Sequence, residues 1–127
     1  MFIKIIIKAI SLKMKIVYID ESNFQFENNH LKVWRNNKDI PFFNTYKRGR
    51  KNIILSIEET EVLYFEINNG TNKSINFLTY MKKLIERIEI KDLPNYLLII
   101  DNCCIHITKE LKYFYNSNKM KVLTIVP

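Results

Sequence analysis

The stretches Lys15-Ile-Val-Tyr-Ile-Asp20 and Tyr96-Leu-Leu-Ile-Ile-Asp101 decide the fold of this chain. Both are apolar runs without polar alternation, as expected for central strands that are covered on both faces. Both end on an aspartate. A long helix between two such strands implies a parallel crossover. We therefore predict neighbouring strands, about 4.8 Å apart, whose terminal carboxylates project from the same edge of the sheet.

The segment between these strands predicts a hairpin and a helix. Asn52–Ile57 and Val62–Ile67 are rich in β-forming residues and are joined by the acidic link Glu58–Glu61, which predicts an antiparallel hairpin. Over Lys73–Ile90 the apolar side chains recur at helical spacing, which predicts an amphipathic helix that ends before Pro94.

The remaining segments complete the sheet. Thr108 is expected to cap a short helix, and Lys121–Val126 is expected to form the last strand. Glu27–Arg50 is the least regular stretch, in which Leu31–Arg35 is expected to add a short strand. The order is strand, antiparallel hairpin, helix, parallel strand, helix and strand. The predicted fold class is therefore α/β, a mixed sheet with helices on its faces.

Composition bounds the class of protein. A chain of 127 residues, 47% hydrophobic, fits one folded domain, and its net charge of +7 favours an anionic partner such as nucleic acid. Adjacent Cys103 and Cys104 fit neither a disulfide framework nor a zinc site, so we expect buried, reduced thiols. Lys4 and Lys8 interrupt the apolar start of the chain, which argues against a signal peptide, and no run approaches the roughly 18 apolar residues of a membrane span.

The two terminal carboxylates are the strongest candidates for chemistry. Two acids held this close repel each other unless a cation lies between them, and hard oxygen ligands suit Mg²⁺ or Mn²⁺. A pair of such ions, roughly 3.5 to 4 Å apart, supports phosphodiester chemistry. The alternative is that Asp20 and Asp101 only turn the chain at the ends of buried strands.

Short motifs around the two acids carry a family resemblance. They are Tyr18-Ile-Asp-Glu-Ser-Asn-Phe24, Trp34-Arg35, Lys47-Arg-Gly-Arg-Lys51, and Ile100-Asp-Asn102 with His106. In order and spacing they resemble the DDE domain of mariner-type and related bacterial insertion-sequence transposases. The resemblance covers residues 15–127, nearly the whole chain.

The resemblance implies a fold, an activity and a cofactor. It implies an RNase H-like sheet in which Asp20 and Asp101 are the first two catalytic acids and the metal ligands. The implied activity is DNA cleavage and strand transfer during transposition, with Mg²⁺ or Mn²⁺ as cofactor. The implied partner is DNA rather than a membrane, bound by a homodimer or another paired complex. The implied location is the nucleus of a eukaryote or the cytoplasm of a bacterium.

One departure from the family pattern concerns a third acid. In the family, the strand that ends here at Val126 and Pro127 runs into a proline-rich turn and a helix that carries a further Asp or Glu. We therefore expect an N-terminal extension at residues 1–14 and, at residues 15–127, a DDE catalytic domain that lacks its last acid-bearing helix. Glu110 is considered as a substitute, whereas strand alternation directs Glu21 to the face opposite Asp20.

Whether the chain is an enzyme therefore stays open. One alternative is a catalytically inactive, transposon-derived remnant that binds DNA non-specifically. Another is an RNase H-like nuclease of a different family, which would cleave DNA without strand transfer.

Two further residues match the family pattern near the acids. They are Asn102 and His106, which we take as accessory candidates. His106 either approaches the metal or the scissile phosphate, or holds its own turn by hydrogen bonds.

A basic cluster and one tryptophan are candidates for DNA binding. The cluster consists of Lys47, Arg48, Arg50 and Lys51. It either grips DNA phosphates without reading sequence or forms a solvated basic turn. Trp34 either stacks on a base or packs under a loop.

Overall fold

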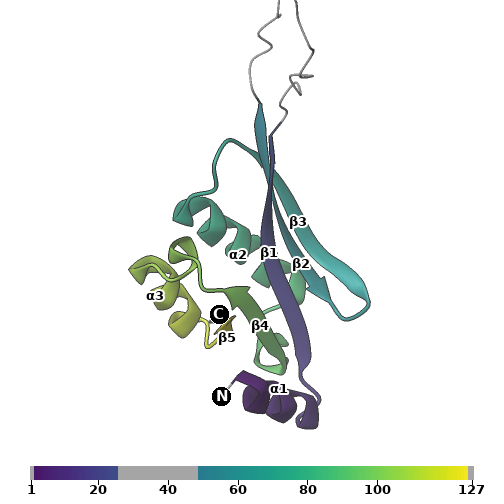
Figure 1. The fold of residues 1–127 in the computed structure, drawn as a ribbon. Helices are drawn as coiled ribbons and strands as arrows, with labels where there is room; N and C mark the ends of the chain where they lie inside the picture. The colour runs from purple at the N-terminus through teal and green to yellow at the C-terminus, as the bar shows by residue number, and fades with distance from the viewer. Residues whose placement is uncertain (1, 26–48, 126–127) are drawn as a thin grey trace, which may run out of the picture.

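The computed structural model describes residues 2–25 and 49–125, in which a five-stranded sheet carries helices on both faces (Figure 1). The strands are β1 (Lys15–Gln25), β2 (Arg50–Glu58), β3 (Glu61–Asn69), β4 (Tyr96–Asp101) and β5 (Lys121–Ile125). The helices are α1 (Phe2–Ser11), α2 (Ser74–Ile88) and α3 (Lys109–Ser117), with the short 3₁₀ helices η1 (Leu93–Asn95) and η2 (Cys104–His106). Within these described ranges, no helix has the length and apolar character needed to cross a membrane.

The strand order across the sheet is β3-β2-β1-β4-β5. Pairing is antiparallel between β1 and β2 and between β2 and β3, and it is parallel between β1 and β4 and between β4 and β5. The predicted mixed α/β sheet is therefore confirmed, together with its hairpin, its central helix and its last strand. Thr108 caps α3 as predicted, because its hydroxyl accepts a hydrogen bond from the Leu111 backbone N–H at 3.4 Å.

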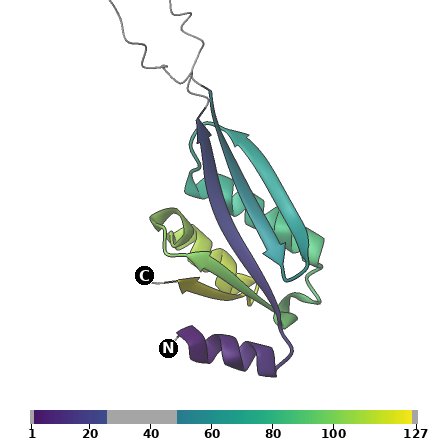
Figure 2. The same cartoon turned by 45° about the vertical axis from the view of Figure 1, so that its right-hand side comes forward.

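Strand β1 is longer than the sequence predicts. The prediction ends it at Asp20, but β1 continues to Gln25 because its second half stays paired with β2, from Glu21 opposite Ile54 to Gln25 opposite Arg50. Its pairing with β4 stops earlier, at Ile19 opposite Ile100. Figure 2 shows β1 running on beside β2 past the end of β4. Asp20 therefore lies in the middle of a strand, at the level where its β4 neighbour ends.

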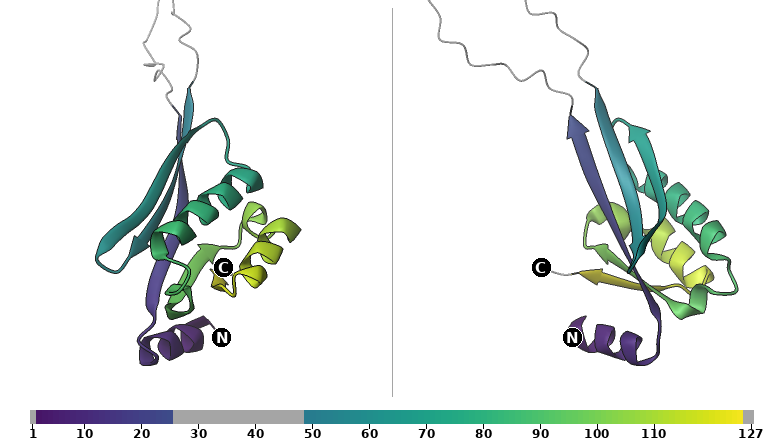
Figure 3. Two further views of the ribbon diagram at one scale, coloured as in Figure 1. Left: turned by 180° about the vertical axis from the view of Figure 1, so that it is seen from behind. Right: turned by 90° about the vertical axis from the view of Figure 1, so that its right-hand side faces the viewer.

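The two faces of the sheet are covered differently. Helices α2 and α3 pack together on one face, where they bury Leu98 and Ile100 of β4. Helix α1, which the sequence analysis does not predict, packs on the other face, where Ala9 lies against Leu97 and Ile99 (Figure 3). Because neighbouring residues of β4 point to opposite faces, the run of five apolar side chains is buried throughout, as expected for a central strand.

A buried hydroxyl pair joins α2 to the hairpin. The Tyr80 hydroxyl of α2 lies 2.5 Å from the Ser56 hydroxyl of β2 and donates to the Tyr64 carbonyl of β3 at 3.0 Å. Tyr80 and Ser56 are fully buried, and burial raises the pKa of the Tyr80 hydroxyl. The pair therefore fixes how α2 sits on β2 and β3.

We predict that Tyr80→Phe lowers the free energy of unfolding by about 1–3 kcal/mol, since the buried Ser56 hydroxyl and Tyr64 carbonyl lose a partner. Urea denaturation followed by circular dichroism measures this change. Tyr18→Phe is the control, because Tyr18 is 48% exposed, and it should change stability by less than about 0.5 kcal/mol. Equal losses in both variants would contradict the assigned role of the Tyr80 hydroxyl.

Candidate active site

Asp20 and Asp101 lie at the same level on the two central strands. The last parallel pair of β1 and β4 is Ile19 opposite Ile100, so each aspartate follows directly after a paired residue. Ile19 and Ile100 are buried under α2, whereas both aspartates are exposed. Strand alternation thus directs both carboxylates away from the α2 side. The arrangement places two hard oxygen ligands beside each other at one end of β4.

His106 lies between two carboxylates. Its Nε2 atom is 3.0 Å from Glu21 Oε1, and its Nδ1 atom is 2.5 Å from Asp101 Oδ1. The ring also lies against Phe77 of α2, with ring centroids 4.1 Å apart. The Glu21 contact is a hydrogen bond, whereas Nδ1 is placed to donate to the Asp101 backbone carbonyl at 3.4 Å and its contact with Asp101 Oδ1 is an ion pair when the ring is protonated. The geometry therefore suits the imidazolium form of His106.

The electrostatic surroundings favour the same form. Burial lowers the pKa of His106, but the hydrogen bond to Glu21 and the negative charges of Asp101 and Glu21 together outweigh it. The net effect raises the pKa of His106 above its ordinary value of 6.5. The His106 side chain is only 4% exposed, so its charge is compensated by these two carboxylates rather than by solvent.

The contact of Glu21 with His106 is the feature that sequence reasoning missed. Alternation does direct Glu21 away from Asp20, onto the face that carries buried Val17 and Ile19. On that face Glu21 contacts His106. His106 lies just past the end of β4 and also contacts Asp101. The second carboxylate oxygen of Glu21, Oε2, accepts from the Asn72 amide at 3.1 Å. Glu21, His106 and Asp101 therefore form one cluster. The alternation of side chains along β1 could not predict it, because His106 comes from another segment.

The turn after β4 carries the remaining candidates. Asn102 is exposed, and Glu110 is exposed in the first turn of α3. Within residues 2–25 and 49–125, no three acidic, histidine or cysteine side chains form a group that could hold a metal ion. Glu110 thus does not complete such a group with Asp20 and Asp101.

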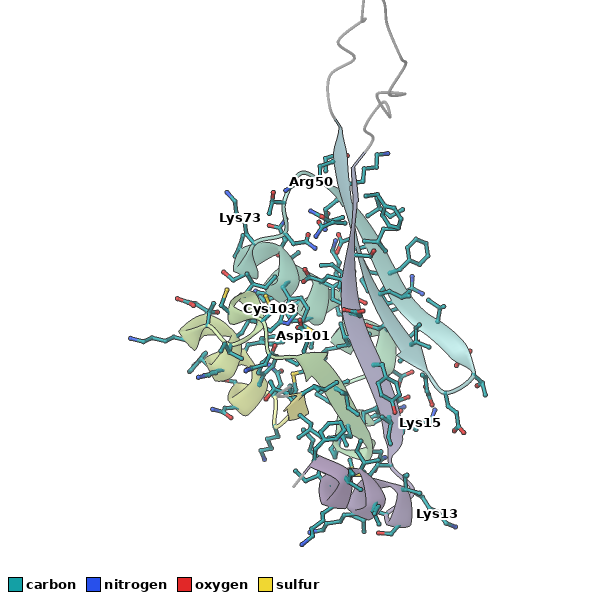
Figure 4. All side chains as sticks on the ribbon, viewed as in Figure 1. Lys13, Lys15, Arg50, Lys73, Asp101 and Cys103 are labelled. Carbon is teal, nitrogen blue, oxygen red and sulfur yellow. The ribbon has the colours of Figure 1, made fainter. Side chains whose placement is uncertain are left out.

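The two cysteines follow β4 into this turn. The prediction of buried thiols is wrong for Cys104, which is exposed, and Cys103 is half-buried; both are free. The reason is that the chain leaves the sheet after Asp101, so neither side chain continues the buried strand. Figure 4 shows Asp101 and Cys103 close to one another beside the end of β4.

Only part of the predicted DNA-binding set lies within the described residues. Arg50 and Lys51 are exposed at the start of β2, and the Arg50 guanidinium donates to the Thr71 hydroxyl at 3.2 Å. Figure 4 places Arg50 at the end of the molecule remote from Lys13. Lys47, Arg48, Trp34 and the predicted strand Leu31–Arg35 lie outside the described residues.

The carboxylates fit part of a site for a divalent cation. Asp20 and Asp101 are exposed, carry hard oxygen donors and sit on neighbouring strands, as Mg²⁺ or Mn²⁺ requires of protein ligands. Asp20 Oδ1 accepts from the Glu21 backbone N–H at 2.8 Å, and Asp101 Oδ1 is engaged by His106. In Asp20 and in Asp101, one carboxylate oxygen, Oδ1, thus contacts a protein group.

Comparison with known proteins shows which family this chain belongs to. A family model described as DDE superfamily endonuclease matches residues 15–126. The search of curated proteins found no match.

Solved structures of a mariner transposase share the fold. A pre-cleavage Mos1 transpososome matches with a TM-score of 0.68 and 14% identity, over 94% of this chain and 40% of that one. The catalytic domain of Mos1 mariner transposase matches with a TM-score of 0.61 and 15% identity, over 94% of this chain and 55% of that domain. A Mos1 paired-end complex with Mn matches with a TM-score of 0.64 and 16% identity, over 94% of this chain and 39% of that one. The chain therefore has the predicted RNase H-like fold and spans about two fifths of the Mos1 chains in the transpososome and the paired-end complex.

We predict that Tyr115→Phe loosens the turn that carries His106. The Tyr115 hydroxyl donates to the His106 carbonyl at 3.2 Å in a buried setting, so its removal should cost about 1–3 kcal/mol of stability. Hydrogen exchange at the His106 amide, which donates to the Cys103 carbonyl, should accelerate. Tyr113→Phe on the same helix is the control, because Tyr113 is 76% exposed. Unchanged exchange in Tyr115→Phe would contradict this role.

Proposed function

The chain belongs to the DDE superfamily endonuclease family, and on this premise we propose that it is the catalytic domain of a mariner-type transposase. The proposed reaction is metal-dependent cleavage of DNA followed by strand transfer. The observation that supports it most is the placement of Asp20 and Asp101 side by side on parallel strands β1 and β4. We further propose residues 15–127 as this domain, with residues 1–14, including α1, as an N-terminal extension.

Asp20 and Asp101 are the proposed catalytic acids and metal ligands. Solved Mos1 structures have been obtained with Mg and with Mn, which supports Mg²⁺ or Mn²⁺ as the cofactor here. The chemistry that such ions supply when bound is stabilisation of the attacking and leaving oxygens of a phosphodiester. The protein's part is to hold two carboxylates on strands that cannot move apart, because both are paired on each side up to that level.

DNA is the proposed substrate and partner. The net charge of +7 suits a polyanion, and the Mos1 relatives were solved as paired-end complexes, one of them with the left transposon end. We propose that this chain also acts as a homodimer or another paired complex on DNA. Such a substrate implies the nucleus of a eukaryote or the cytoplasm of a bacterium.

A second candidate is a catalytically inactive remnant that binds DNA non-specifically. It is favoured by the number of carboxylates: Asp20 and Asp101 supply two negative charges, whereas two divalent ions carry four. Within residues 2–25 and 49–125, no third ligand joins them. Occupancy of a second metal position should therefore be low in this chain as it stands.

We predict weak or no plasmid nicking by the 127-residue chain in Mn²⁺. Nicking should strengthen when the chain is extended by the turn and acid-bearing helix that the family places after the last strand. In the extended protein, Asp20→Asn or Asp101→Asn should reduce nicking to the background rate, because each removes a charged ligand. Conversion of supercoiled to open-circular plasmid on an agarose gel measures the rate.

Asp92→Asn is the matched control, since Asp92 is an exposed aspartate in the turn before η1 and should leave the rate unchanged. Nicking that survives Asp20→Asn would refute the assignment of the acids. An extended protein that folds and binds DNA but never nicks it would favour the inactive remnant.

We also predict weak duplex binding without sequence preference, governed by salt. Lys51→Gln should lower affinity equally for unrelated sequences and reduce the slope of log K against log salt by about one, if Lys51 contacts a phosphate. Fluorescence anisotropy with two unrelated duplexes over a range of salt measures both quantities. Lys13→Gln is the control, because Lys13 lies at the end of the molecule remote from Arg50, the neighbour of Lys51 (Figure 4). Strong preference for one duplex, or affinity that resists salt, would be inconsistent with electrostatic binding.

A further inference from the structure

A buried histidine connects one exposed carboxylate to one that is nearly buried. The side chains of Glu21, His106 and Asp101 are 15%, 4% and 57% exposed, respectively. The contacts run in a line, from Glu21 Oε1 to His106 Nε2 and from His106 Nδ1 to Asp101 Oδ1. The exposed end of this line is the carboxylate that we propose as a metal ligand.

Three contacts with residues other than Asp101 hold His106 in place. Its ring rests on Phe77 of α2, its carbonyl accepts from the buried Tyr115 hydroxyl, and its backbone N–H donates to the Cys103 carbonyl at 3.0 Å. These contacts come from α2, from α3 and from the turn itself. They fix the backbone of the turn and the place of the ring on Phe77, and the hydrogen bond from Nε2 to Glu21 then orients Nδ1 toward Asp101.

Glu21 is fixed in the same way. Its backbone lies in β1 opposite Ile54 of β2, four residues before the end of the strand at Gln25. One carboxylate oxygen faces His106 and the other accepts from Asn72, so both oxygens have a donor. Asp101, by contrast, is the last residue of β4 and is mostly exposed, so without a partner its side chain would be free to change rotamer.

We propose that Glu21 is a positioning residue, which acts through His106 to hold Asp101 by Oδ1 so that its other oxygen, Oδ2, is presented to a cation in one orientation. The claim that a cation binds there rests on the proposed function, but the positioning of Asp101 is a property of the chain alone. A partner that holds a ligand through its other atoms typically changes metal affinity by roughly 10–100-fold when it is removed. The competing explanation is that the contacts among Glu21, His106 and Asp101 only stabilise the fold.

The experiment compares the native chain with four single variants and with one double variant, which combines Glu21→Leu and His106→Phe. Glu21→Leu removes the acceptor for His106, and His106→Phe keeps a ring against Phe77 but removes both N–H groups. Glu21→Gln is the conservative variant, because its amide can donate to Nε2 of neutral His106 while its oxygen accepts from Asn72. Glu58→Leu is the matched control: Glu58 is an ion-paired carboxylate, 13% exposed, that contacts Lys15 at 3.1 Å. Lys15 lies opposite Tyr96, at the other end of β4 from Asp101.

The first measurement needs no metal. Vicinal couplings in the NMR spectrum report whether the Asp101 side chain occupies one χ1 rotamer. We expect one rotamer in the native chain, Glu21→Gln and Glu58→Leu, and averaging over several in Glu21→Leu and His106→Phe. A single Asp101 rotamer in Glu21→Leu would overturn the proposal, as would equal averaging in Glu58→Leu. Should Glu21→Leu fail to fold, His106→Phe carries the same comparison.

The second measurement is Mn²⁺ binding, followed by the electron paramagnetic resonance of free Mn²⁺. Glu21→Leu and His106→Phe should each bind Mn²⁺ roughly 10–100-fold more weakly, whereas Glu21→Gln and Glu58→Leu should bind like the native chain. The double variant should be no weaker than His106→Phe, because Glu21 acts only through His106. Additive losses would overturn the proposal. A native chain that binds no Mn²⁺ would count against the proposed function, while the Asp101 rotamers would still decide the positioning role.

Discussion

The parallel pairing of β1 with β4 is the constraint on which the rest of the structure depends. The two strands lie at the centre of the sheet, and the register that sets Ile19 opposite Ile100 also brings Asp20 and Asp101 to one level. Covering both faces of β4, with α2 and α3 on one side and α1 on the other, makes a shift of register costly. Burial of apolar side chains fixes the register of the two strands, and this register fixes the spacing of the proposed acids. Interactions of the carboxylates are not needed for it.

The unequal lengths of β1 and β4 create the rest of the site. β4 stops at Asp101, while β1 continues along β2 to Gln25. The part of β1 after Asp20 therefore pairs with β2 on one edge and has no β4 partner on the other. The turn after β4 brings His106 beside that stretch, where it meets Glu21. A buried imidazole between two carboxylates is tolerated there because each charge has a partner. The same contact ties the end of β4 to β1 where backbone pairing has ceased.

This arrangement separates binding from orientation among neighbouring acids. Asp20 and Asp101 are exposed and therefore accessible to a cation, whereas Glu21 is mostly enclosed and faces the protein. Two adjacent residues of one strand, Asp20 and Glu21, are therefore proposed to have different roles, because alternation sends them to opposite faces. The physical reason is general: an exposed carboxylate changes rotamer freely unless a second, enclosed residue holds it.

The sequence by itself determined the mixed α/β sheet, the hairpin, the central helix and the pairing of the two strands that carry Asp20 and Asp101. These features follow from apolar periodicity and from burial, which are local properties of the chain. Only the tertiary structure decided that β1 continues past Asp20, since that depends on its pairing with β2. It alone also decided the contact of Glu21 with His106, 85 residues apart, because the meeting depends on where β4 ends and how the next turn folds back. No pattern along either segment encodes such a contact, since each side chain is placed by elements other than its own.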